Sequence, residues 1–210
     1  MQEGLLPLFP LQVVLLPGGE LPLHIFEDRY KEMIGEVIRD RLEFGVVLAN
    51  EKGIVNTGCT ATVDRVLRQY DDGRMDILTR GRRRFEIMLL NDERSFLRGT
   101  VEFFDDDDDS VPPPGELQER AIRSYNELQS VSAGEPLSSG AGEDPQLSFQ
   151  LAQPVLDLPF RQVLLAMRSE SERLKRLAEF LPSYMARQRK IQHVKEVAPR
   201  NGHAYGHVEE

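Results

Sequence analysis

The side chains that could carry out covalent chemistry are few. The chain has one cysteine, Cys59, at the start of a predicted strand, and His24 lies between Leu23 and Ile25 ahead of the first predicted helix. A thiol activated by an imidazole is a common nucleophile, so a hydrolase that uses Cys59 or His24 is one hypothesis. We predict instead that Cys59 is a small buried residue, as lone cysteines commonly are, and that His24 stabilises a turn or the edge of the core. The sequence therefore predicts no catalytic residue.

Arg80–Arg84 is the one basic cluster, four arginines interrupted by a glycine, and it suggests nucleic acid as a ligand. Alternate side chains of a strand point to opposite faces, so we expect Arg82 and Arg84 on one face and Arg83 on the other. Proteins that bind single strands also interleave basic residues with aromatic ones that stack on bases, and this cluster contains none. We therefore predict a solvated face with ion pairs.

Two further groups of side chains have the chemistry of metal ligands. The carboxylates Asp105–Asp109 lack the spaced oxygen ligands and the closing glutamate of a calcium loop, and their mutual repulsion predicts a solvated linker. His203 and His207 are four residues apart, but Gly202 and Gly206 disfavour the helix that would bring the two imidazoles together. We therefore predict no metal site and no cofactor.

Composition restricts the classes of function. The chain has 210 residues, 40% of them hydrophobic and 29% charged, as in a globular protein of one or two domains. Its formal net charge is −9, which argues against nucleic acid as the main partner because phosphate neutralisation requires a basic surface. A single cysteine excludes a disulfide or a cysteine-based zinc site within one chain.

No segment predicts a membrane span or a secretion signal. The longest nearly apolar stretch covers residues 5–16 and is interrupted by two prolines and a glutamine. A helix that spans a bilayer needs roughly 20 apolar residues. The first ten residues also lack the basic start and the small-residue cleavage site of a secretory signal. We predict a cytoplasmic protein with no membrane partner.

Residues 1–104 carry the pattern of several short strands. The apolar run over 5–16 predicts an extended segment at the edge of a sheet or at the start of a strand, and not a central strand, because its prolines cannot donate ladder hydrogen bonds. Continuous apolar residues over 44–49 predict a strand buried on both faces. Alternation over 84–89 and 97–103 predicts two half-buried strands. Short strands separated by turns are typical of a small barrel or sandwich.

A single helix interrupts these strands. It begins near Glu27 and Asp28, whose charges suit the positive end of a helix, and we expect a charge pair involving Glu27 and Arg29 to fix it against the sheet. Its predicted buried face consists of Tyr30, Met33, Ile34, Val37 and Ile38. Strand signals resume after Asp40, and Asp71-Asp72-Gly73 predicts a hairpin turn.

Residues 105–147 differ in composition from both ends of the chain. They carry a net charge of −9 and are rich in proline, glycine and serine, whereas residues 1–104 carry −3 and residues 148–210 carry +3. We predict an acidic linker, then a first helix with one apolar face over 117–128, then a flexible loop over 132–146.

Residues 148–197 are predicted to form a helical subdomain. A short helix is expected over 160–167, and the capping box Ser169-Glu-Ser-Glu172 predicts the start of a longer one. Pro182 should kink or restart that helix, because proline removes a backbone donor. Residues 198–210 are predicted to be a flexible tail.

Seven short motifs occur in an order that resembles a known family. They are Leu6-Pro-Leu-Phe-Pro-Leu11, Leu15-Leu-Pro-Gly18, Leu21-Pro-Leu-His-Ile-Phe-Glu-Asp-Arg-Tyr30, Gly58-Cys-Thr-Ala61, Val63-Asp-Arg-Val66, Asp72-Gly-Arg74 and Gly81-Arg-Arg-Arg-Phe85. As an ordered set they resemble the N-terminal substrate-binding domain of the ATP-dependent Lon protease. The resemblance covers roughly residues 5–195.

The resemblance implies a fold and a set of signature positions. The implied fold is of the α+β class: a six-stranded pseudo-barrel like that of PUA domains, with one inserted helix, followed by a C-terminal helical subdomain. The signature positions, for which we predict structural roles, are Pro7, Phe9, Pro10, Pro17, Pro22, Phe26, Glu27, Arg29, Tyr30, Gly58, Cys59, Gly81, Arg84 and Phe85.

The resemblance also implies a function, with one departure. Lon proteases continue into an ATPase module and a Ser-Lys protease domain, and this sequence contains no Gly-x-x-x-x-Gly-Lys-Ser/Thr loop to hold phosphates. We therefore predict a non-catalytic module that recognises unfolded or extended polypeptide or a partner protein. A barrel that binds a small molecule and PUA-like RNA binding are the alternatives. The oligomeric state stays open.

Overall fold

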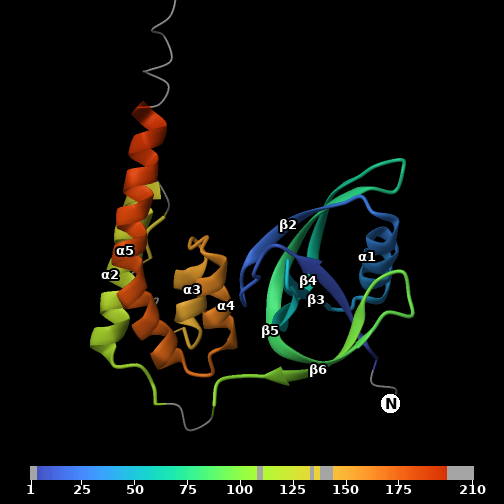
Figure 1. Cartoon of the computed structure of the whole chain (residues 1–210), viewed down its shortest axis with the longest axis horizontal. Coiled ribbons are helices and arrows are strands. Elements are labelled where there is room, and N and C mark those ends of the chain that lie inside the picture. The colour runs from blue at the N-terminus through green and yellow to red at the C-terminus, as the bar shows by residue number, and fades with distance from the viewer. Residues whose placement is uncertain (1–3, 108–110, 133–134, 138–143, 198–210) are drawn as a thin grey trace, which may run out of the picture.

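The computed structural model describes residues 4–107, 111–132, 135–137 and 144–197. A β-rich part comes first and a helical part second, as expected for the α+β class (Figure 1). The elements are β1 (Leu6–Leu11), β2 (Glu20–Ile25), α1 (Asp28–Asp40), β3 (Phe44–Asn50), β4 (Gly53–Gln69), β5 (Met75–Asn91), β6 (Arg98–Phe104), α2 (Gly115–Ser132), α3 (Leu147–Ala152), α4 (Leu158–Ala166) and α5 (Glu170–Val197).

The strands close into a small barrel. Their order is β2-β5-β4-β3-β1-β6, and β6 also pairs with β5. Closure is possible because β4 and β5 are each 17 residues long and carry several bulges, which bend a strand and increase its twist. The first half of β5 pairs with β2 and β4, and its second half pairs with β6. The prediction of a six-stranded barrel is confirmed.

The prediction that the first strand lies at an edge is wrong, whereas its alternative, a proline at the start of a strand, describes Pro7, the second residue of β1. β1 lies between β3 and β6. The Leu8 N–H points toward β6 and donates to the Leu97 carbonyl at 2.8 Å. Alternate backbone nitrogens of a strand point to opposite sides, so the nitrogen of Pro10, like that of Leu8, points toward β6. The pairing of β1 with β6 has already ended there, at Pro7. Pro7 faces β3 one residue before pairing with that strand begins. Both prolines therefore occupy positions where no ladder donor is needed.

Helix α1 follows the predicted periodicity. Tyr30, Met33, Ile34 and Val37 are buried, and the Tyr30 ring stacks on Phe9 of β1 with 4.0 Å between centroids. The helix lies on the side of the barrel away from the other helices (Figure 1). Ile38, predicted to be buried, is exposed. The helix ends one turn later, with Arg41 in the left-handed conformation.

The helical part differs from the prediction in two respects. Helix α3 was not predicted at all. Helix α5 runs without interruption through Pro182, so of the kink or restart predicted there, the restart does not occur. Helices α2 and α5 lie side by side, and α3 and α4 lie between them and the barrel (Figure 1). The predicted loop over 132–146 falls partly, and the predicted tail over 198–210 wholly, outside the described residues.

One buried arginine joins the helices to the barrel. The Arg161 side chain, on α4, donates hydrogen bonds to the carbonyls of Ala152, Gln153 and Val155 and to the carbonyl of Val14 in the barrel, at 2.9–3.1 Å. The first three of these carbonyls lie at and after the C-terminus of α3, which a cation stabilises. Burial lowers the pKa of Arg161, but four carbonyls keep the buried charge satisfied.

Candidate functional site

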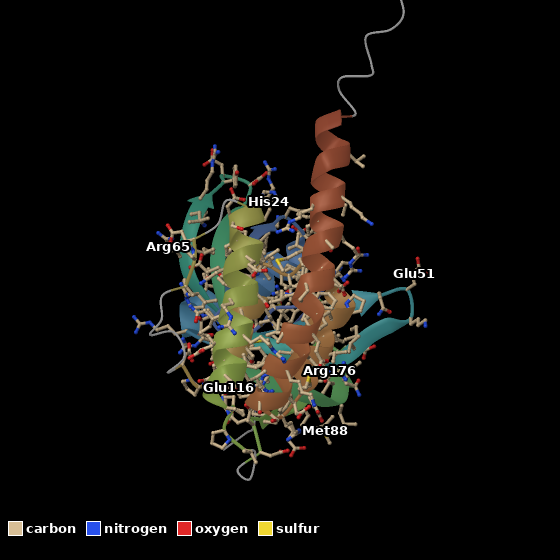
Figure 2. All side chains as sticks on the ribbon, turned by 90° about the vertical axis from the view of Figure 1, so that its left-hand side faces the viewer. His24, Glu51, Arg65, Met88, Glu116 and Arg176 are labelled. Atoms are coloured by element: carbon tan, nitrogen blue, oxygen red, sulfur yellow. The ribbon has the colours of Figure 1, made fainter. Side chains whose placement is uncertain are left out.

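An apolar hollow lies between the barrel and α4. Its volume is about 800 Å³. One wall is the hairpin of β3 and β4, whose tip carries Glu51 and stands out from the barrel (Figure 2). The other wall is α4. We call this hollow the groove; the residues that line it are Gln12, Leu48, Ala49, Asn50, Glu51, Lys52, Val55, Thr57, Leu158, Pro159, Gln162, Val163 and Ala166.

Local signals in the sequence place both walls. At the hairpin tip, Gly53 adopts a φ of 117°, and the Asn50 side chain accepts a hydrogen bond from the Lys52 N–H at 2.8 Å. Helix α4 begins at Asp157, whose carboxylate accepts from the Phe160 N–H at 3.0 Å. These two devices determine where the hairpin turns and where the helix starts.

A single hydrogen bond crosses the floor of the groove. The Gln162 side-chain nitrogen donates to the Thr57 carbonyl at 3.0 Å, between residues 105 positions apart in the chain. The Gln162 side-chain oxygen is buried and accepts no hydrogen bond from the part of the chain that the structure describes. After Gln162 along α4, Val163 is 42% exposed and Ala166 is also exposed.

The groove offers apolar contact rather than acid–base chemistry. Its charged lining residues are Glu51 and Lys52, both at the hairpin tip, and most of the remaining surface is aliphatic. General acid–base catalysis needs a titratable group within hydrogen-bond reach of a reacting atom. Nothing in the lining pairs such a group with a nucleophile, so the arrangement suits a binding site.

The basic cluster lies outside the groove and is largely neutralised. Arg80 pairs with Glu20 at 2.6 Å and with Asp64 at 2.8 Å, and Arg83 pairs with Glu43 at 3.1 Å. The prediction of a solvated face with ion pairs is confirmed for these two arginines.

For Arg84 the same prediction is wrong. Its side chain is 2% exposed and pairs with Asp106 at 2.8 Å. A bulge in β5 explains the error: Gly81 pairs with Ala61 and Arg84 with Cys59, which leaves two arginines opposite Thr60 and shifts the alternation. Arg84 therefore points inward, away from Arg82.

The prediction that Asp105–Asp109 form a solvated linker is wrong for one residue. Asp106 is not a solvated linker residue: its carboxylate bonds to Arg84 and Arg173, and its side chain is 24% exposed. Burial raises the pKa of Asp106, but the hydrogen bonds and charges of Arg173 and Arg84 outweigh this and lower it below its ordinary value. Asp108 and Asp109 lie outside the described residues.

Cys59 and His24 lie apart. The Cys59 thiol is fully buried and contacts the Thr60 carbonyl at 3.4 Å. His24 pairs with Asp76 at 2.6 Å near the beginning of β5, eight residues from the position that pairs with Cys59. The structure therefore does not bring together the nucleophile and base of the hydrolase hypothesis, and the role predicted for Cys59 fits its burial.

Cys59 provides a direct test of this conclusion. Burial raises the pKa of the Cys59 thiol to about 12, so at neutral pH it is a protonated, inaccessible group. We expect no labelling of the folded protein by a thiol reagent at pH 7–8 over an hour, and complete labelling within minutes in denaturant. Mass spectrometry measures both. Rapid labelling of the folded protein would contradict the predicted structural role.

Comparison with known proteins identifies the architecture. A family model described as the ATP-dependent protease La (LON) substrate-binding domain matches residues 5–194. The chain belongs to this family. Among solved structures, the Lon N-terminal domain protein from Xanthomonas campestris is 24% identical with a TM-score of 0.65, and the superposition covers 83% of this chain and 97% of that one. The N-terminal domain of Mycobacterium avium complex Lon protease is 16% identical with a TM-score of 0.58, over 84% and 97% of the two chains.

Curated relatives are much longer than this Lon substrate-binding domain. The Lon protease of Parabacteroides distasonis is 30% identical over 105 residues, which make up 46% of this chain and 13% of that protein. The Lon protease of Anaeromyxobacter dehalogenans is 29% identical over 108 residues, again 13% of its length. No described helix of this chain is long and apolar enough to cross a membrane.

The positions predicted to be family signatures lie in and around the barrel, outside the groove. Phe9, Tyr30, Arg29 and Glu27 meet where α1 packs on β1, and Glu27 pairs with Arg29 at 2.7 Å inside the helix start rather than with the sheet. Ion pairs that tie α1 to the sheet region come from Arg94, which pairs with two glutamates of the helix.

Of Gly58, Gly81, Phe85 and Phe26, all but one are buried. Gly58 pairs with Phe85 across β4 and β5, and a Cβ at Gly58 would lie 2.5 Å from the Phe85 ring. Gly81 exchanges backbone hydrogen bonds with the turn after Pro17. Phe26 is the exception, because its side chain is 59% exposed and stacks on His24.

Sequence reasoning missed the groove. Its walls come from the β3–β4 hairpin and from α4, and none of the signature positions lines it. One signal is present in the sequence. Val163 and Leu164 are consecutive apolar residues of the helix predicted over 160–167, and consecutive residues of a helix face different sides; Leu164 is buried and Val163 is exposed.

Proposed function

We propose that this Lon substrate-binding domain is a non-catalytic module that binds extended, apolar segments of polypeptide in the groove. The observation that carries the proposal is an aliphatic hollow of about 800 Å³ that opens between two separate parts of the fold and has charge only at its rim. Membership of a substrate-binding domain family supports polypeptide as the ligand class. An extended polypeptide presents side chains at regular spacing, and its apolar side chains can pack against the aliphatic walls of the groove.

Two other modes of binding are less well supported. Strand addition to the free edge of the sheet would use β2, which pairs only with β5, but Pro22 removes a donor from that strand. RNA binding would use Arg80 and Arg83, whose charges are already paired with carboxylates. A small molecule would fit the volume of the groove, so the titration described next includes that alternative as an outcome.

The test is a titration of a reduced, unfolded protein into this chain. Extended chain loses conformational entropy on binding, so we expect a Kd in the micromolar range or weaker. Apolar contact should change little between about 0.05 M and 0.5 M salt, although the Debye length falls from about 14 Å to about 4 Å. No binding to any unfolded protein at tens of micromolar, together with tight capture of one metabolite or one RNA, would contradict the proposal.

The substitution Val163→Arg locates the site. It places a charge on the exposed side of the α4 wall, and we expect affinity for unfolded protein to fall about tenfold or more, because a desolvated charge replaces an aliphatic contact. The matched control is Ile191→Arg on α5, a helical position of similar exposure that does not line the groove. Equal affinities for the two variants would place the binding site elsewhere.

A further inference from the structure

A buried ion cluster joins the barrel to the helices close to the groove. We call it the clasp; it consists of Arg84, Asp106, Ser148, Glu170 and Arg173. Arg173 holds both oxygens of Asp106 at 2.5 Å and one oxygen of Glu170 at 2.8 Å. Arg84 holds Asp106 at 2.8 Å, and the Ser148 hydroxyl donates to Glu170 at 2.5 Å and accepts from Arg173 at 2.8 Å.

The clasp also holds the end of α4. Arg84 donates to the Met167 carbonyl at 2.5 Å and to the Leu165 carbonyl at 3.4 Å, and Arg173 donates to the Met167 carbonyl at 2.9 Å. The last carbonyls of a helix have no partner within it and carry partial negative charge, so two guanidinium groups satisfy and stabilise them. Ala166, which lines the groove, lies between these two carbonyls.

We propose that Arg84 and Asp106 are positioning residues for the groove. They belong to β5 and to the segment after β6, so they anchor the C-terminal end of α4 to the barrel, whereas Gln162 anchors its middle through Thr57. Helix α4 has nine residues, so a shift at its C-terminal end moves Val163 and Ala166 relative to the hairpin wall. The expected effect on affinity for polypeptide rests on the proposed function, whereas the expected effect on the position of α4 does not.

Because the clasp is buried, each of its charged side chains depends on the presence of the others. Its two arginines are 2% and 0% exposed, and two carboxylates balance the two positive charges. The rings of Phe104 and Phe149 pack on the Arg84 guanidinium, and Phe149 packs on that of Arg173. Removing one carboxylate leaves a buried positive charge uncompensated, so the remaining groups must separate or admit water. Asp106 is the most exposed of the four charged members and is the natural point of release.

The experiment replaces Asp106 by Asn in the full chain and measures amide hydrogen exchange. We expect the amides of Val163, Leu164 and Ala166 to exchange about tenfold faster or more, because α4 loses its anchor, while those of α1 keep their rates. Affinity for reduced, unfolded protein should fall about tenfold. The variant Asp106→Glu, which restores the charge, should recover most of both effects.

A second ion pair on the same chain provides the control. Arg94 also joins two carboxylates, Glu32 at 2.6 Å and Glu36 at 2.5 Å, and lies over a phenylalanine ring, but it anchors α1 instead of α4. Arg94→Met should leave α4 exchange and affinity unchanged. If Asp106→Asn prevents folding, Arg84→Lys keeps the charge but loses the geometry of the guanidinium, and the same faster exchange in α4 is expected.

Two results would overturn the inference. One is unchanged α4 exchange in a folded clasp variant, and the other is faster α4 exchange with unaltered affinity. Failure of the proposed function would look different: the natural chain would bind no unfolded protein, while the exchange measurement would still show whether the clasp holds α4.

Discussion

Replacing Arg173 by methionine is expected to lower the free energy of unfolding by about 3–5 kcal/mol. The Arg173 side chain is fully buried, and its loss leaves Glu170 without its cationic partner and Asp106 with Arg84 alone. Methionine fills much of the volume, so the loss reflects uncompensated charge more than a cavity. Urea denaturation monitored by circular dichroism measures the change.

The dependence of this effect on pH follows from Asp106. Its pKa is lowered in the folded state, so its stabilising contribution is present above the unfolded-state pKa and disappears as the pH falls through the folded-state pKa. The natural chain should therefore lose stability below about pH 4, and Arg173→Met should flatten that part of the profile. The control is Arg39→Met, which breaks an exposed pair with Asp40 and should leave stability unchanged. Equal losses in the two variants would contradict the importance of the clasp.

Replacing Phe85 by alanine should cost about 3–5 kcal/mol by a different mechanism. Phe85 is fully buried in a small cluster with Leu8, Val47 and Ile87, separate from the main core. Its ring fits against Gly58, where a Cβ would lie 2.5 Å away, so the backbone leaves room for this ring and the truncation opens a cavity.

The neighbours of Phe85 provide a control variant and a test of its contact with Gly58. Phe103→Ala removes the residue that pairs with Phe85 on β6, but this ring is largely exposed and its loss should cost much less. Gly58→Ala should destabilise the natural chain, and by less in the Phe85→Ala background, where its contact with the ring is gone and those with the Val46 carbonyl and the Val47 side chain remain. Additive effects of the two substitutions would show that the glycine and the ring do not share this space.

Much of the fold could be predicted from local patterns. The spacing of Tyr30, Met33, Ile34 and Val37 has the period of a helix with one buried face, and α1 buries those four residues. The apolar run of β3 likewise predicts a strand that is buried on both faces, and its first four residues are buried. Patterns of this kind depend on neighbours in sequence, so a single chain reveals them.

Features set by distant contacts could not be predicted in this way. The central place of β1, between β3 and β6, is compatible with Pro10 because the pairing with β6 ends before that residue. No property of Pro10 itself reveals this. Arg84 points inward because a bulge opposite Thr60 shifts the strand by one residue. The groove depends on Thr57 meeting Gln162, two residues with no shared local pattern.

The most direct measurement is a map of amide chemical-shift changes as reduced, unfolded protein is added to the labelled chain. We expect the changes to concentrate at Ala49, Val55, Val163 and Ala166, on both walls of the groove, to persist at about 0.5 M salt, and to require about tenfold more unfolded protein in Val163→Arg. Changes confined to the face of Arg80 and Arg83, or an undisturbed groove at saturating concentrations, would contradict polypeptide recognition at this site.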